Sequence, residues 1–183
     1  ETLTVSTLTV NDGSRVGAQS PFANAGMFAA TVTPAAAVPL QINAGLNDAW
    51  YNPATNGQGF LITVFPDRNE LFLAWFTSDT DRPPEDVVAL LGEPGHRWLT
   101  AQGPFIGDTA NLTIFVTEGG VFDAAEPAAT TDPAGDGTMT IEFADCENGL
   151  VSYEIASLGI SGEIPIQRIV PDNVALCELL STQ

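Results

Sequence analysis

Beyond residue 47 the chain alternates apolar and polar residues in short runs broken by turn residues, a pattern typical of β-strands. The clearest runs are residues 59–65 (GFLITVF) and 71–77 (LFLAWFT), which flank the turn-forming stretch 66–70 (PDRNE). Two such runs around one short turn predict a β-hairpin.

The same alternation predicts further strands at residues 87–91, 97–101, 110–118, 138–144, 150–155 and 163–170. The longest loop spans residues 124–137, and a last short segment, residues 174–180, brings Cys177 back towards Cys146. About eight or nine strands in a meander predict an all-β fold. The architecture is expected to be either an antiparallel β-barrel or a two-sheet β-sandwich.

The first 45 residues differ from the rest of the chain. Residues 1–10 (ETLTVSTLTV) alternate as a strand does if a bulge at residues 6–7 resets the phase. The apolar positions of this strand are Leu3, Val5, Leu8 and Val10. We therefore predict an N-terminal extended β arm over residues 1–45 and a β-sandwich or barrel domain over residues 46–183.

The chain is strongly acidic. It contains 23 Asp and Glu residues against 5 Arg and Lys residues, which gives a net charge of -18, and nearly all of this charge lies beyond residue 46. Such a field repels nucleic acid and anionic lipid, so we expect no nucleic-acid partner. No stretch is apolar for long enough to form a transmembrane helix, and we expect no insertion into a membrane.

Two cysteines, Cys146 and Cys177, form one potential pair. A lone pair in an acidic, β-rich chain predicts a disulfide, and the alternative is two unpaired thiols in a cytosolic protein. The start at Glu1 fits a mature end left by signal-peptide cleavage. We therefore predict a secreted protein that is extracellular or bound to the cell surface.

Several short motifs resemble one known group of proteins. They are AWYNPATNGQGF at residues 49–60, LAWFT at 73–77, GHRWLTAQG at 95–103, and the later DCENG, SGEIPIQR and DNVALCELL. Together they resemble a family of exported proteobacterial β-domains, found mostly in marine and environmental species, to which no activity is assigned. The resemblance covers about residues 46–183. It implies export and a compact β domain, with residues 1–45 outside it.

Few residue patterns in the chain predict catalysis. His96 is the only histidine, the chain lacks a G-x-S-x-G motif, and its carboxylates are too numerous for spacing to select a catalytic pair. We therefore predict that the chain is not an enzyme and holds no cofactor other than calcium. Four acidic residues in one loop are candidate calcium ligands, and the alternative is a solvated acidic loop: Asp79, Asp81, Glu85 and Asp86.

The aromatic residues are the other candidates for binding. If Trp75 and Phe76 point to opposite faces of a strand, one of them leaves the core and can stack on a sugar ring. The candidate ligand-binding residues are Trp50, Tyr51, Trp75 and Trp98. The alternative is that these rings fill the core.

Two functions fit these observations. The first is an extracellular, non-catalytic structural subunit that assembles with copies of itself by adding its N-terminal strand to the sheet edge of a neighbouring subunit. Such head-to-tail addition forms filaments unless the rotation closes a ring. The second is a binding module for a carbohydrate or another small ligand, which a cluster of exposed rings beside a carboxylate or amide would favour.

Overall fold

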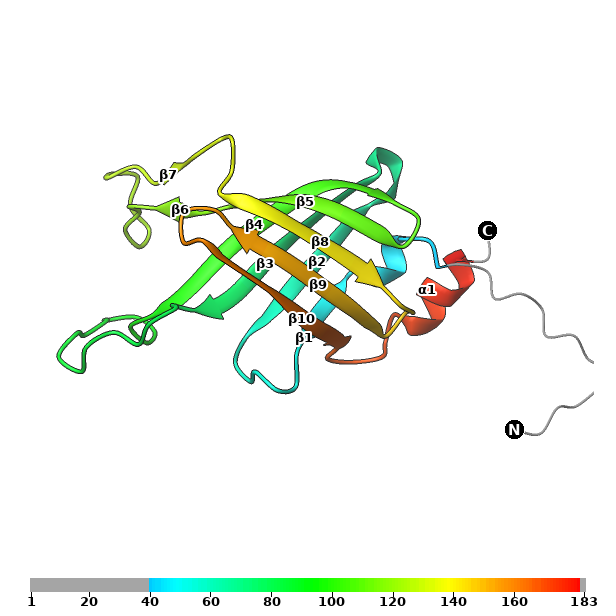
Figure 1. Ribbon diagram of the computed structural model, residues 1–183, viewed down its shortest axis with the longest axis horizontal. Helices are drawn as coiled ribbons and strands as arrows, with labels where there is room; N and C mark the ends of the chain where they lie inside the picture. The colour runs from blue at the N-terminus through cyan, green and yellow to red at the C-terminus, as the bar shows by residue number, and fades with distance from the viewer. Residues whose placement is uncertain (1–39, 182–183) are drawn as a thin grey trace, which may run out of the picture. The chain divides into compact units, whose positions relative to one another are not determined.

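The computed structural model describes residues 40–181. Within this part of the chain, eight antiparallel strands form a closed barrel in the order β1-β10-β9-β8-β5-β4-β3-β2 (Figure 1). The predicted all-β fold is confirmed, and the barrel is the architecture observed. The barrel strands are β1 (Asp48–Tyr51), β2 (Gly59–Phe65), β3 (Glu70–Ser78), β4 (His96–Ile106), β5 (Thr109–Phe115), β8 (Gly137–Phe143), β9 (Asn148–Ile155) and β10 (Ile160–Arg168).

Shorter elements complete the described chain. Two short strands, β6 (Thr117–Glu118) and β7 (Thr130–Thr131), pair with each other in a separate two-stranded sheet. The helical elements are η1 (Ala44–Leu46), η2 (Pro66–Arg68) and α1 (Val174–Ser181). The short C-terminal segment predicted at residues 174–180 lies in the helix α1.

The β2–β3 hairpin has the two strands that its sequence predicts. Pairing runs from Gly59↔Phe76 to Phe65↔Glu70, and buried residues alternate with more exposed ones along both strands. The turn is the 3-10 helix η2, and Asn69 follows it in the left-handed conformation with φ 49°. Asparagine visits that conformation more readily than most residues, so it suits this position.

The prediction of a strand at residues 87–91 is wrong. Residues 79–95 form the loop between β3 and β4, and Ser78 pairs with His96 across the base of this loop. Val88 and Leu90 are 81% and 102% exposed. Because the two strands already pair at the base, residues 87–91 extend beyond the end of the sheet and have no strand to pair with.

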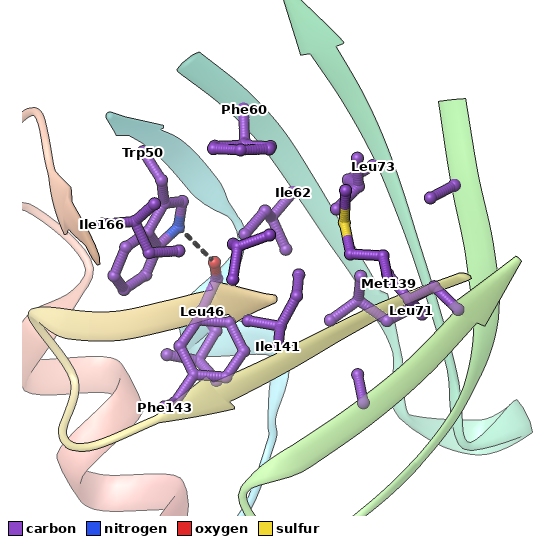
Figure 2. Packing of buried hydrophobic residues seen from close by; sticks show 14 of the residues in the cluster. Leu46, Trp50, Phe60, Ile62, Leu71, Leu73, Met139, Ile141, Phe143 and Ile166 are labelled. Atoms are coloured by element: carbon purple, nitrogen blue, oxygen red, sulfur yellow. Dashed lines mark hydrogen bonds between the residues drawn. The ribbon is translucent and has the colours of Figure 1, made fainter. Parts of the chain in front are cut away.

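Buried apolar side chains fill the barrel towards one end. Figure 2 shows Trp50, Phe60, Ile62 and Phe143 in one buried cluster with Leu46 of η1. Trp50 is fully buried, its indole N–H donates to the carbonyl of Leu46 at 3.2 Å, and the Trp50 and Phe143 rings meet edge-on. The helix η1 therefore closes this end of the core.

Residues 40–45, which the sequence suggested were part of the arm, pack with the barrel. Ile42 is 5% exposed, and its N–H donates at 2.7 Å to a carbonyl in the β4–β5 turn. The side chain of Asn43 caps η1 by accepting from the Gly45 N–H, and its amide donates to the carbonyl of Cys177. The barrel unit therefore begins before residue 46.

The predicted disulfide between Cys146 and Cys177 is confirmed. It joins the β8–β9 turn to α1, and the two Cα atoms lie 5.9 Å apart. Next to it, a Cβ atom on Gly45 would lie 2.3 Å from the backbone nitrogen of Cys177. Only glycine fits this approach of η1 to α1, so the disulfide and the glycine together define the closed end of the barrel.

One stretch of the barrel wall has a strand on only one side. Strand β1 is short and meets β10 at only two residue pairs, from Trp50 and Tyr51. Within the described chain, residues 160–166 of β10 therefore pair with β9 and with no strand on their other side. This stretch contains Pro165, and proline, which lacks an N–H, is typical of edge strands.

Candidate ligand-binding site

A cavity of about 1000 Å³ is lined by residues from the end of the barrel away from α1. Figure 1 shows the β3–β4 loop and the β6 and β7 strands at that end, opposite α1. The β1–β2, β3–β4, β5–β8 and β9–β10 connections all contribute to its lining. In an antiparallel barrel, every second connection lies at the same end, so these four meet there. The volume lies at the upper end of the range of roughly 300–1000 Å³ found for small-molecule sites. We call this space the mouth cavity.

Trp75 is the main aromatic residue in the interior of the mouth cavity. It has the same parity on β3 as the buried Leu71 and Leu73, so its side chain points inward and is only 6% exposed. Its ring stacks on Phe60 with centroids 5.5 Å apart, and it meets Tyr153 edge-on at 5.1 Å. These rings give the cavity a flat apolar wall.

Two polar atoms in this aromatic group have no partner in the part of the chain that the structure describes. The indole N–H of Trp75 and the hydroxyl of Tyr153 make no hydrogen bond within residues 40–181. Tryptophan and tyrosine usually bond these atoms when buried. Because every fully buried side-chain nitrogen and oxygen of the described residues has a partner, these two atoms are accessible from the cavity. Both can therefore bond a ligand.

Gly162 makes room for the phenol of Tyr153. The two residues are opposite each other on β10 and β9, and a Cβ atom on Gly162 would lie 2.8 Å from the Tyr153 hydroxyl oxygen. A larger side chain at residue 162 would displace the phenol. The glycine therefore helps to set where the hydroxyl lies in the mouth cavity.

Carboxylates dominate the charged groups around the mouth cavity. Glu118, Asp132, Asp136 and Glu163 line it, and none of the four has an ion-pair partner among the described residues. Asp136 accepts hydrogen bonds from the backbone N–H and the hydroxyl of Ser157, which leaves its charge uncompensated.

Arg97 is the only arginine among the described residues that line this cavity. Its Nη2 lies 2.6 Å from Oδ2 of Asp79, and its Nη1 donates to the backbone carbonyl of His96 at 2.8 Å. Its charge is therefore already balanced by Asp79, and the mouth cavity is negative.

The structure separates the four aromatic residues predicted to bind a ligand. Trp75 and Trp98 line the mouth cavity, and Trp98 is 54% exposed. Trp50 is buried at the closed end, where its N–H is already bonded. Tyr51 lies outside the lining, and its hydroxyl oxygen accepts a hydrogen bond from Gln167. Two of the four residues therefore lie at the candidate site.

The candidate calcium ligands Asp79, Asp81, Glu85 and Asp86 are not gathered into a metal-binding group. Among residues 40–181, no three His, Cys, Asp or Glu side chains come together in a way that could hold a metal ion. Asp79 is instead engaged by Arg97. The structure thus favours the alternative of a solvated acidic loop for these residues.

Sequence reasoning missed Tyr153, Glu118 and Glu163. Tyr153 lies between the buried residues Val151 and Ile155 at positions of the same parity on β9. The sequence signal for Tyr153 was a tyrosine at an inward position near the end of a strand, where its hydroxyl can reach a cavity. The two acids carried no signal, because the sequence does not indicate which of its 23 carboxylates meet at one end of the barrel.

No protein family, curated protein or solved structure matches this chain in the comparisons made. The resemblance to exported proteobacterial domains therefore stays a prediction. In the part of the chain that the structure describes, no helix has the length and apolar character needed to cross a membrane. A disulfide of this kind is typical of proteins in oxidising compartments.

Proposed function

We propose that this protein is an extracellular, non-catalytic binding module that takes up a small organic ligand in the mouth cavity. The observation that carries the proposal is the Trp75 side chain, which is almost fully buried, lines the cavity and has an N–H without a partner among residues 40–181. Small-molecule sites are concave and combine apolar and aromatic surface with convergent polar groups, and the mouth cavity has both kinds of lining, with polar residues in the majority. Apolar residues such as Leu99, Ile155 and Ile160 complete its inner lining.

Replacing Trp75 with phenylalanine is expected to weaken ligand binding about threefold to tenfold. Trp75→Phe removes the N–H and keeps an aromatic ring, and one hydrogen bond contributes roughly 0.5–1.5 kcal/mol. The ligand would first be found by a thermal-shift screen of phenols, amines and monosaccharides, since a bound ligand raises the unfolding temperature. Affinity would then be measured by isothermal titration calorimetry.

The matched control is Tyr51→Phe, which alters an aromatic residue outside the cavity. We expect its affinity for the same ligand to equal that of the unaltered protein. If no compound in the screen shifts the unfolding temperature, or if both variants weaken binding equally, the mouth cavity is not the binding site.

A second function, self-assembly through the N-terminal arm, is favoured by the open edge of β10. Leu3, Val5, Leu8 and Val10 lie outside the described residues, so this function rests on the edge alone. Among the described residues, no strand pairs with the outer side of residues 160–166, and an edge of this kind can accept an added strand from a neighbouring copy.

If the arm joins subunits, deletion of residues 1–16 is expected to convert a large assembly into a monomer. The deleted segment contains the apolar strand pattern, which has high β-propensity. Light scattering and electron microscopy of both proteins, at equal concentration and salt, would measure this. Identical masses for the full-length and shortened chains would rule out assembly through this arm.

A further inference from the structure

We propose that the ligand of the mouth cavity is an organic cation, with a flat ring and a hydrogen-bond acceptor at one end and a protonated amine at the other. This assignment rests on the proposed binding function. It follows from two independent features of the cavity, the unpartnered polar atoms on its aromatic wall and the charge of its lining.

The aromatic wall selects the ring and the acceptor. The Trp75 indole can only donate a hydrogen bond, so its N–H, which has no partner within residues 40–181, matches an oxygen or another acceptor on the ligand. The Tyr153 hydroxyl can donate or accept, and its ring meets Trp75 at an interplanar angle of 62°. A phenol or a similar oxygen-bearing ring would match both the donor and the ring faces.

The lining selects the charge of the other end of the ligand. Glu118, Asp132, Asp136 and Glu163 line the same cavity without a counter-ion within residues 40–181. Arg97, the arginine in the lining, is held by Asp79 and does not balance them. A clustered charge of one sign attracts the opposite charge and repels its own, so a cationic ligand is favoured over an anionic one.

Exposed aromatic surface supports the same choice. Trp98 lines the cavity, and 54% of its surface is exposed. A tryptophan face is the most favourable of the aromatic faces for an ammonium group. His96 also lines the cavity, and its ring lies next to Glu93, with Nε2 3.8 Å from a carboxylate oxygen. The opening of the cavity therefore offers an aromatic face that an ammonium group can contact.

Three small phenols that differ only in the charged end provide the test. They are tyramine, which is a cation, 4-propylphenol, which is neutral and of nearly the same shape, and 3-(4-hydroxyphenyl)propionate, which is an anion. Calorimetric titration of the full chain at low salt is expected to give an affinity for tyramine about tenfold above that for 4-propylphenol, equivalent to about 1.4 kcal/mol. The anion is expected to bind most weakly, and the advantage of tyramine should shrink as salt is added.

Variants of the acidic residues in the lining test whether the preference for tyramine arises from the charge of the cavity or from its shape. The double variant Asp132→Asn with Glu163→Gln is expected to lose most of the preference for tyramine and to keep its affinity for 4-propylphenol. Glu154→Gln removes one charge from a residue of β9 outside the lining and is expected to keep the preference. Asp136 is left unchanged because it bonds Ser157.

The outcomes distinguish the two proposals. If 4-propylphenol or the anion binds as tightly as tyramine, the cation assignment is overturned and the binding function stands. The assignment is also overturned if all three phenols fail to bind while the wider screen finds another ligand. If neither the phenols nor the screen gives any binding, the proposed function itself falls.

Discussion

Replacing Arg168 with alanine is expected to lower the free energy of unfolding by about 3–5 kcal/mol, because it breaks a buried ion pair from one side. The Arg168 side chain is 3% exposed, and its Nη1 lies 2.6 Å from Oδ2 of Asp48, which is itself 10% exposed. The guanidinium also donates to the backbone carbonyls of Cys146 and Gly45. It lies over the ring of Trp50, 4.7 Å from the ring centroid.

These contacts explain the size of the expected effect. Arg168 lies on β10 and bonds β1, η1 and the β8–β9 turn, so one side chain ties together the segments that close the barrel. The alanine variant would leave the Asp48 carboxylate and two carbonyls buried without this donor. An unpaired buried charge is far more costly than the loss of a surface pair.

Chemical denaturation of Arg168→Ala, with Arg97→Ala as the control variant, would measure this loss of unfolding free energy. Arg97 also pairs with a carboxylate at 2.6 Å, but the two side chains are 51% and 37% exposed. Exposed pairs of this kind contribute about 0–1 kcal/mol, so the two arginines provide a matched contrast. Equal losses of stability in the two variants would contradict the claim that the buried contacts of Arg168 stabilise the closed end of the barrel.

Removing the disulfide with Cys146→Ser and Cys177→Ser together is expected to lower the free energy of unfolding by about 3–4 kcal/mol. The bridge closes a loop between residues 31 positions apart, and cross-linking restricts the unfolded chain. It also fixes α1 beside Gly45, where η1 and α1 approach closely. Without it, α1 is expected to separate from η1 before the barrel strands unfold.

Denaturation with and without a thiol reductant would check this expectation. The reductant should lower the unfolding midpoint of the unaltered protein towards that of the double-serine variant. It should leave the midpoint of that variant unchanged, which controls for effects of the reductant itself. If full reduction leaves the unfolding midpoint of the unaltered protein unchanged, the disulfide adds no stability.

The barrel strands were predictable wherever burial alternates strictly along the chain. Residues 59–65 and 138–144 read as strands because one parity faces a packed interior and the other faces outward. The run at 87–91 has similar composition and forms no strand, because pairing depends on a neighbour that the local sequence does not contain. Local patterns therefore predicted most of the wall and misassigned one loop.

The site was less predictable than the wall. Trp50 and Trp75 both lie on inward positions of strands, and both are in register with Phe60. The indole of Trp50 nevertheless donates to Leu46 of η1, whereas Trp75 lines the mouth cavity and has no partner for its N–H within residues 40–181. What each ring meets depends on the connections of all eight strands. The meeting of Tyr153 with Trp75 is equally non-local.

The most direct test of binding in the mouth cavity is the indole region of an amide nitrogen–proton NMR spectrum during a tyramine titration. The chain has 3 tryptophans, so three indole N–H signals report on three places. We predict that the Trp75 signal shifts and saturates, that Trp98 shifts less, and that Trp50, bonded to Leu46, stays in place. A Trp75 signal that does not move while tyramine binds, or a Trp50 signal that moves as much, would contradict the account.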